Sequence, residues 1–277
     1  MLLGDNLEFF KYQACGNDYV YIDCFDRNIS NPDELAKKIS DRNFGVGSDG
    51  IILIMPPSNI NSDAKMRIFN SDGSEAEMCG NGIRCVGKYV FDNKKNSQKN
   101  IARIETLAGI KILELIESSE KISKIKVSMG TPEFLGNFYL EEIKNISKKN
   151  GIYISVGNPH FVIFCENIDI NKINIENIGK KIQNSRYFKN GVNIEFVEIK
   201  SKNNIKIRVF ERGSGETLAC GTGACASAFA AILQKYCDEK QKIIVNLKGG
   251  KLEIEFINNK IYMTGEAVKV FKGEYYD

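Results

Sequence analysis

The 277-residue chain has few of the residues that metal sites and nucleic-acid interfaces need. His160 is the only histidine, and none of the eight cysteines forms a CxxC pair. Zinc and iron–sulfur sites use such clusters, so we expect no metal. The net charge is only +3, and lysines alternate with acids throughout. This pattern gives no basic face, so nucleic acid is not an expected partner.

Long apolar segments are also missing. The longest, residues 50–57, is far shorter than the roughly 20 residues that a membrane-spanning helix takes. The first residues, MLLGDNLEFFKY, lack the basic start and apolar run of a secretory signal. We therefore expect a cytoplasmic protein without membrane contact, whose cysteines stay reduced. The length predicts one large or two modest domains with cores of their own.

The chain does contain an internal repeat. KMRIFNSDGSEAEMCGNG (65–82) and KIRVFERGSGETLACGTG (206–223) align without gaps at an offset of 141 residues, and seven of 18 positions are identical. The same offset aligns Gly16-Asn17 with Gly157-Asn158, each of which precedes an apolar run. Two matches at one offset indicate a duplication. We predict two related halves with a boundary near residues 120–130.

Each half combines strand patterns with one apolar helix. KMRIF and KIRVF alternate polar and apolar residues, as half-buried strands do. NGIRCVGKYVFD and the alanine-rich GTGACASAFAAILQKY follow as helices, and the second is apolar nearly all round, which is typical of a buried helix. The fold class that we predict is α/β (α+β) with two pseudo-symmetric domains. We expect each to be a curled, mainly antiparallel sheet around a central helix, and, if the two halves face one another, the active site to lie in the interdomain cleft.

A cysteine stands directly before each of these two helices, at Cys79 and at Cys220. The first N–H groups of a helix are unpaired and its N-terminus is positive, so such an end binds a carboxylate well. The glycines that follow let a ligand approach the backbone closely. The same field lowers the pKa of a thiol from about 8.5 toward neutrality. Each motif therefore predicts an anion cradle beside an activated sulfur.

Two activated thiols on one ligand suit the inversion of a carbon that bears hydrogen. A base removes the proton from one face and an acid delivers a proton to the other, each with a pKa near the operating pH. Helix N-termini around the carboxylate stabilise the developing negative charge. This arrangement demands no pyridoxal group, and we expect no cofactor. Free cysteines are usually buried as small hydrophobes, which is our interpretation of Cys15, Cys24, Cys85, Cys165, Cys225 and Cys237.

At these residues the sequence resembles the diaminopimelate epimerase family. The similarity is carried by GNDY, RNFGVGSDG, RIFNSDGSEAEMCGNGIRC, GNPHFV, GVNIEFV and VFERGSGETLACGTGACA, and it covers essentially the whole chain. It implies an isomerase, a cofactor-independent two-cysteine epimerase that interconverts LL- and meso-diaminopimelate in lysine and peptidoglycan-precursor biosynthesis. It also implies that the last strand returns to the first domain. The predicted domains are then residues 1–125 with 266–277, and residues 126–265.

The resemblance further implies a set of site residues. Cys79 and Cys220 would be the acid–base pair, and His160 and Glu211 would tune the thiols and contact the reacting centre. The implied substrate-binding residues are Asn17, Asn70, Gly80, Asn81, Asn158, Asn193, Glu211, Arg212, Gly221 and Thr222. Arginine clamps carboxylates and asparagine both donates and accepts, which fits an amino acid with a second amino-acid end. Many family members carry glutamine where this chain has Gly50, so a substrate contact there is lost or replaced.

Three other functions share parts of this pattern. A proline or hydroxyproline epimerase would use the same two cysteines, but Arg212 and the asparagines favour a bis-amino-acid substrate. A thiol redox protein would join Cys79 and Cys220 in a reversible disulfide, yet it needs no carboxylate cradle. A non-catalytic amino-acid-binding protein would need the cradles but no activated sulfurs. The expected partner is a small molecule, diaminopimelate, and the residues leave a homodimer open.

Overall fold

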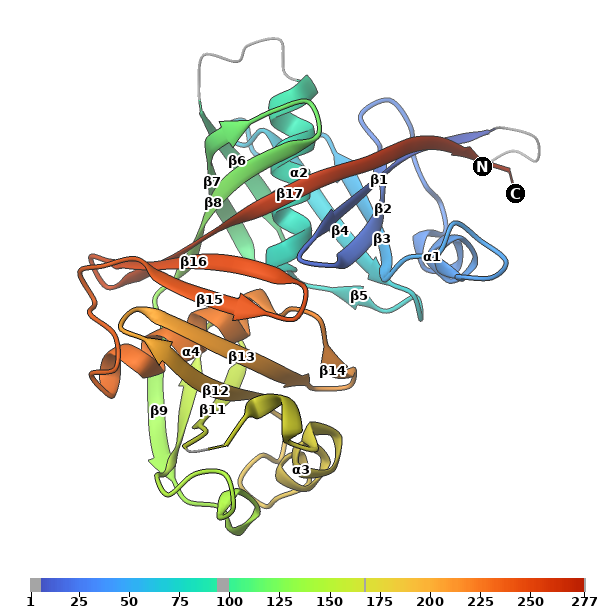
Figure 1. Ribbon diagram of the computed structural model, residues 1–277. Helices are drawn as coiled ribbons and strands as arrows, with labels where there is room; N and C mark the ends of the chain where they lie inside the picture. The colour runs from blue at the N-terminus through green and yellow to red at the C-terminus, as the bar shows by residue number, and fades with distance from the viewer. Residues whose placement is uncertain (1–5, 94–99, 167, 277) are drawn as a thin grey trace. The chain divides into compact units, whose positions relative to one another are not determined.

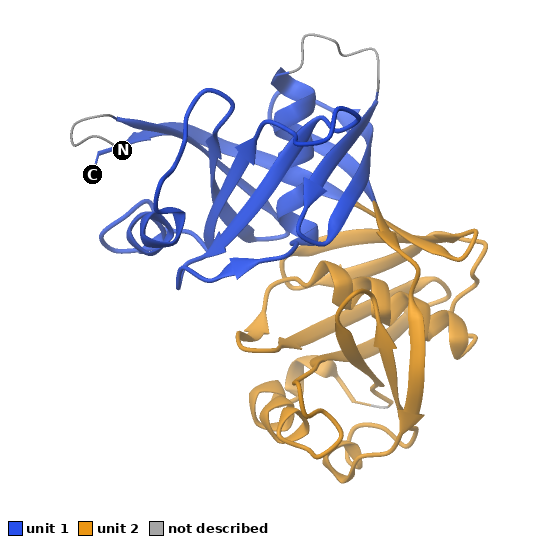
Figure 2. Ribbon diagram, turned by 180° about the vertical axis from the view of Figure 1, so that it is seen from behind, with its two compact units in different colours: residues 1–127, 265–277 blue, residues 128–264 orange. Residues whose placement is uncertain are grey.

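The chain folds as two units in the computed structural model, which describes residues 6–93, 100–166 and 168–276. Unit 1 comprises residues 1–127 and 265–277, and unit 2 comprises residues 128–264 (Figure 2). The chain passes from unit 1 to unit 2 within strand β8 (Ile122–Gly130) and returns within strand β17 (Lys260–Tyr275). The last eleven residues of β17 therefore belong to unit 1, with the N-terminus.

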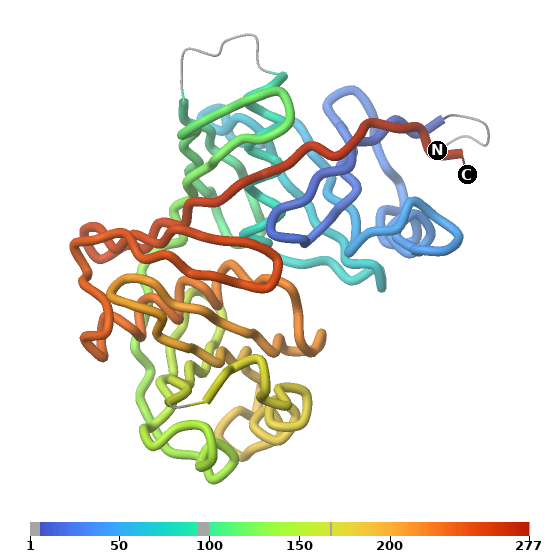
Figure 3. Tube along the Cα trace, in the orientation of Figure 1, coloured from blue at the N-terminus to red at the C-terminus, as the bar shows by residue number. Residues whose placement is uncertain are grey.

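Unit 1 is a sheet wrapped around helix α2 (Figure 1). Its remaining strands are β1 (Leu7–Ala14), β2 (Asn17–Asp23), β3 (Gly50–Met55), β4 (Ala64–Asn70), β5 (Glu75–Ala76), β6 (Ile101–Thr106) and β7 (Gly109–Ser118). Pairing runs β1–β2–β3–β4–β6–β7–β8–β17 and back to β1, so the sheet closes on itself. The β2–β3 and β4–β6 pairs are parallel within this mainly antiparallel sheet. Figure 3 shows β17 running beside β1.

Helix α2 (Gly80–Asn93) fills the inside of this sheet. Eleven of its 14 residues are buried, and it contacts β1, β2, β4, β6 and β7. Gly87 is required by this packing, because a Cβ there would lie 2.6 Å from Leu113 Cδ2 on β7. Helix α1 (Pro32–Ser40) is amphipathic and covers the outer side, where Ala36 and Ile39 join the apolar cluster of β1, β2 and β3.

Unit 2 repeats this plan around helix α4 (Gly221–Leu233), which buries nine of its 13 residues. Its strands are β9 (Glu133–Phe138), β10 (Gly151–Ser155), β11 (Pro159–Phe164), β12 (Asn193–Ser201), β13 (Asn204–Glu211), β14 (Gly215–Thr217), β15 (Ile243–Leu247), β16 (Gly250–Ile257) and the start of β17. The parallel pairs are β11–β12 and β13–β15, at the same two places in the order as in unit 1. Helix α3 (Ile175–Gln183) and two 3₁₀ turns, η1 (Glu141–Ile143) and η2 (Ile170–Lys172), complete the unit.

The repeated sequence forms the same ion pair in both units. Arg67 on β4 binds both carboxylate oxygens of Glu75 at 2.7 and 3.0 Å. Arg208 on β13 binds Glu216 in the same way at 2.6 and 2.8 Å. Each pair spans the turn that leads to the cysteine, and each turn contains a glycine with positive φ, 87° at Gly73 and 84° at Gly213. The identical positions of the repeat thus hold equivalent turns before α2 and α4.

The mixed α/β class predicted from the sequence is confirmed, and the two helices predicted after Cys79 and Cys220 are present as α2 and α4. The ends of the chain differ from the prediction. The last strand, expected to belong to the first domain alone, is part of one 16-residue strand, β17, that begins in unit 2. Strands β1, β6 and β9 were not predicted. Among the described residues, no helix is long and apolar enough to cross a membrane.

Candidate active site

In unit 1 the sulfur of Cys79 lies at the start of α2. It accepts a hydrogen bond from the backbone N–H of Gly82 at 3.3 Å and donates one to Asn17 Oδ1 at 3.4 Å. Accepting from the third residue of a helix is the usual role of an N-cap side chain, so the sulfur is fixed by the helix start itself. Of the eight cysteines, Cys79 alone is partly exposed, and the rest are buried.

A hairpin turn places Asn17 beside this sulfur. Cys15 and Gly16 connect β1 to β2 with φ of 53° and 78°, as a two-residue turn between twisted strands requires. The Asn17 amide donates to Asp49 Oδ2 at 2.6 Å, which turns its oxygen toward Cys79. Arg42 in turn binds Asp49 Oδ1 at 3.0 Å. Sequence reasoning missed Asp49 and Arg42, because acids and bases near glycine turns are common on protein surfaces.

Two other predicted residues of unit 1 use their side chains locally. Asn81 is 3% exposed, and its side chain accepts a hydrogen bond from Arg84 Nη2 at 2.9 Å. The buried Arg84 guanidinium also donates to Gly80 O at 3.0 Å and so braces the first turn of α2. Asn70 ends β4, and its amide donates to Ser74 Oγ at 3.0 Å. The sequence predicts that the backbone of Gly80-Asn81 binds a carboxylate. The hydrogen bonds from Arg84 hold that backbone in place.

In unit 2 Cys220 is the N-cap residue of α4, and its sulfur lies 3.5 Å from Thr222 Oγ1. The pKa of this thiol is raised well above its ordinary value, first by burial and then by the negative charges of Glu211 and Glu195. The sequence-based expectation of a lowered pKa is wrong for Cys220. Helix N–H groups do lower it, but the loss of water and two nearby carboxylates outweigh them. Cys220 therefore holds its proton at neutral pH.

Glu211 ends β13 beside this thiol. Burial raises the pKa of the carboxyl, although hydrogen bonds from Thr217 and Cys220 oppose that effect. The Thr217 hydroxyl donates to Glu211 Oε1 at 2.5 Å. Two acidic groups that share a buried space and have raised pKa values are typical of sites that transfer protons.

His160 on β11 is fully buried and bonded through both ring nitrogens. Its Nδ1 lies 2.7 Å from Glu195 Oε1 on β12, and its Nε2 lies 3.0 Å from Asn158 Oδ1. Glu195 is also fully buried, and sequence reasoning missed it. The signal that could have revealed it is a charge inside NIEFV, an otherwise apolar and buried strand.

The remaining predicted residues of unit 2 lie where β12 and β13 meet. Asn193 Oδ1 accepts from the backbone N–H of Arg212 at 2.9 Å. The Arg212 guanidinium donates to Asn190 O at 2.9 Å, and its stem packs against Gly191, where a Cβ would lie 2.5 Å from Arg212 Cδ. This contact requires glycine at 191, and it fixes the direction in which Arg212 leaves the strand.

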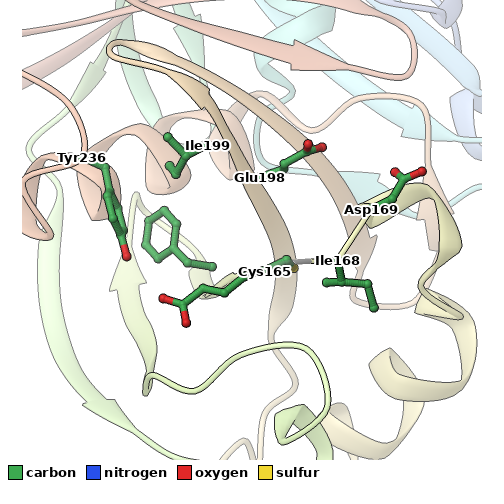
Figure 4. A pocket seen from close by; sticks show the side chains of 8 residues that line it. Cys165, Ile168, Asp169, Glu198, Ile199 and Tyr236 are labelled. Carbon is green, nitrogen blue, oxygen red and sulfur yellow. The ribbon is translucent and has the colours of Figure 1, made fainter.

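The structure also gives a local reason for Gly50. Its φ is 156°, and a Cβ there would lie 2.1 Å from Phe69 O. A side chain at this position would require the backbones of β3 and β4 to move apart. The described cavity of about 560 Å³ lies elsewhere, in unit 2, and none of the predicted site residues lines it (Figure 4). Cys165 on its wall is inert, because burial raises its pKa to about 12.

The fold defines a structural class that includes two-domain epimerases of known structure. A predicted epimerase from Pseudomonas aeruginosa has the same fold, with a TM-score of 0.76 over 97% of this chain and 98% of that one, at 10% identity. The family model for diaminopimelate epimerase matches residues 9–135 and 152–270. The chain therefore belongs to the diaminopimelate epimerase family.

Full-length relatives agree with this assignment. The chain is 49% identical to a diaminopimelate epimerase of Acetivibrio thermocellus over 97% of its own length and 98% of the relative's. It is 47% identical to one of Methanococcus maripaludis over 97% and 99% of the two lengths. The predicted enzyme class is confirmed: the chain is an isomerase with the diaminopimelate epimerase activity of lysine biosynthesis, LL to meso. The redox and binding-protein alternatives are set aside.

Proposed function

We propose that this enzyme inverts the α-carbon of diaminopimelate with Cys79 and Cys220 as its acid–base pair. The observation that carries the proposal is the duplication. Each unit ends an equivalent turn in a cysteine that is followed directly by a buried helix, α2 after Cys79 and α4 after Cys220. A stereocentre has two faces, and a duplicated acid–base group supplies one group for each face. The proton transfer uses the two sulfurs alone.

The other predicted residues take roles that fit their surroundings. The N–H groups after each cysteine, at Gly80-Asn81 and Gly221-Thr222, hold the reacting carboxylate and stabilise the negative charge that develops at the α-carbon. Glu211 lies beside Cys220 and His160 interacts with Glu211, so the two together set the charge state of the thiol. The residues that hold the rest of the substrate are Asn17, Asn70, Asn158, Asn193 and Arg212. Arg212 clamps a carboxylate, and the asparagines bind the distant amino-acid end.

Exchange of the α-hydrogen in deuterated water tests the mechanism. Reduced wild-type enzyme with LL-diaminopimelate is expected to form the meso isomer and to place deuterium at the α-carbon. Cys79→Ala and Cys220→Ala should each abolish epimerisation, although one remaining thiol can still exchange slowly on its own face. Cys225→Ala is the matched control, because this buried cysteine lies on α4 five residues after Cys220.

Two outcomes would contradict the mechanism. Reduced wild-type protein that exchanges no deuterium is not a two-base epimerase. Full epimerase activity in either Cys79→Ala or Cys220→Ala would show that the second sulfur is not required.

A cytoplasmic location and a homodimer complete the proposal. Ile110 and Ile112 on the outer face of β7 each expose 47% of their surface, and apolar residues that gather in this way favour a protein partner. A second copy of the chain is the partner that we propose. Light scattering after size exclusion should give twice the chain mass, and Ile112→Glu should reduce it. A wild-type mass equal to one chain would refute the dimer.

A further inference from the structure

The duplication provides an internal comparison of what lies beneath each helix start. In unit 1 a Cβ at Gly82 would lie 2.7 Å from Ile52 Cδ1. In unit 2 a Cβ at Gly223, the repeat position, would lie 2.6 Å from Glu195 Oε1. The strand registers agree, because Ile52 pairs with Ile68 and Glu195 pairs with Val209, which is 141 residues after Ile68. Glu195 therefore occupies the place of an isoleucine.

At two neighbouring positions of the repeat, the residue in unit 2 is also more polar than its counterpart in unit 1. The repeat offset takes Tyr19 to His160 and Val86 on α2 to Ser227 on α4. His160, Glu195 and Ser227 are each fully buried. Unit 2 thus carries a histidine and a carboxylate on the strands that pack against α4 and a hydroxyl on α4 itself, where unit 1 carries a tyrosine and two aliphatic residues.

Burying these three polar side chains lowers the stability of the folded protein. Among the described residues, Glu195 Oε2 and Ser227 Oγ are buried without a hydrogen-bond partner. A buried ion pair seldom stabilises more than a well-packed apolar set, and unit 1 folds with such a set. An incompletely bonded buried carboxylate therefore needs an explanation other than stability.

The hydrogen bonds show what Glu195 does to His160. Nδ1 faces a carboxylate oxygen of Glu195, and Nε2 faces the amide oxygen of Asn158. The ring of His160 is thus held between two oxygens, one of them a carboxylate. The groups that interact with this pair are Glu211 at the end of β13 and Cys220 at the start of α4.

We propose that Glu195 is a positioning residue of the epimerase, which keeps His160 oriented and positively charged beside Glu211 and Cys220. The charge offsets the negative charge that appears when Cys220 passes its proton to the substrate carbon. Glu195 itself touches neither the substrate nor the sulfur's proton. The proposal rests on the proposed role of Cys220, and it makes the two halves of the site chemically unequal.

The single histidine allows a direct test in the wild-type enzyme. Protein labelled with ¹⁵N-histidine gives ring signals from His160 alone. We expect both ring nitrogens to be protonated at pH 7.5, with a slowly exchanging Nδ1 proton. An unprotonated Nδ1 overturns the proposal without any variant. This readout does not use activity, so it stays interpretable even if Cys220→Ala proves active and the two-base mechanism fails.

Substitution of Glu195 then distinguishes a role in orienting His160 from a purely structural role. Glu195→Gln keeps the shape but removes the charge, and Glu198→Gln on the same strand, where Glu198 binds the surface residue Lys200, is the matched control. We expect Glu195→Gln to lower kcat about 10- to 100-fold with little change in KM, and to move His160 to a neutral imidazole spectrum. A lower melting temperature with unchanged kcat and unchanged His160 signals would show a structural role and overturn the proposal.

Discussion

At Glu211, burial opposes ionisation. The pKa of this carboxyl is raised above its ordinary 4.5, so the charged form is less favourable in the folded protein than in the unfolded chain. The stability that the protonated form provides is complete below about pH 4.5 and is lost as the pH rises through the folded-state pKa. Glu211→Gln should therefore melt higher than wild type at pH 8, and the difference should disappear toward pH 4.

Thermal unfolding at several pH values measures this effect. Glu216→Gln is an informative control with the opposite sign, because Arg208 lowers the pKa of Glu216. Its melting temperature should fall below that of wild type at pH 8. A Glu211→Gln variant that is destabilised at pH 8 would refute the assignment of a raised pKa.

Cys79 and Cys220 should differ in their reaction with alkylating reagents. Cys79 is partly exposed, whereas Cys220 is buried and has a raised pKa, so its reactive thiolate is scarce at pH 7. Limiting iodoacetamide at pH 7 should modify Cys79 first, and mass spectrometry of the peptides identifies the site. Modification of Cys220 should become faster as the pH rises above 9. Equal labelling of the two at pH 7 would contradict the inferred difference.

The two cysteines could be found from sequence because they repeat at a fixed offset. Their unequal environments could not, because those depend on residues that the repeat does not share. Tyr19 and His160 occupy matching positions, yet only a structure shows that the histidine meets a carboxylate from another strand. Helix-dipole reasoning also gave the wrong direction for Cys220, since the burial of a side chain is a tertiary property.

Among the elements, the two repeated turns should differ in their dependence on arginine. Arg208 has a side chain that is 9% exposed, and it also donates to Ile170 O and Ile173 O, while the side chain of Arg67 is 32% exposed. Breaking a buried pair costs about 3–5 kcal/mol, whereas an exposed pair is worth about 1 kcal/mol or less. Arg208→Ala should therefore lower the unfolding free energy far more than Arg67→Ala. Denaturant unfolding of the two variants measures the difference, and equal losses would contradict it.

Strands with a long apolar run or a long alternating pattern were predicted, whereas shorter or more polar strands were missed. β9 has no buried face of its own, since none of its six residues is buried although three of them are large and apolar, and Gly136 interrupts it with a φ of 138°. β6 does alternate, with Ala102 and Ile104 buried, but its six residues include only two large apolar side chains. The union of two segments into β17 depends on partners from both units, β16 and β1, that no local pattern contains.

For the whole molecule, the end of the chain should be essential to unit 1. Residues 267–275 of β17 include the partners of β1, from Leu7 opposite Tyr275 to Gln13 opposite Val268. A chain ending at residue 265 should lose amide protection throughout β1 and melt at a lower temperature. A chain that lacks only residues 276–277 retains the pairing and serves as the control. Hydrogen exchange reads out β1 directly, and wild-type protection there in the shorter chain would contradict the prediction.

The strand that closes unit 1 also imposes an order on folding during synthesis. Unit 2 is one continuous stretch, residues 128–264, whereas unit 1 needs residues 265–275 for its final strand. On the ribosome, the second-made unit therefore has all its residues before the first-made unit does. The N-terminal unit therefore keeps β1 unpaired on one side until residues 268–275 have been made. A duplicated protein built in this way completes its first-made half only after its second-made half.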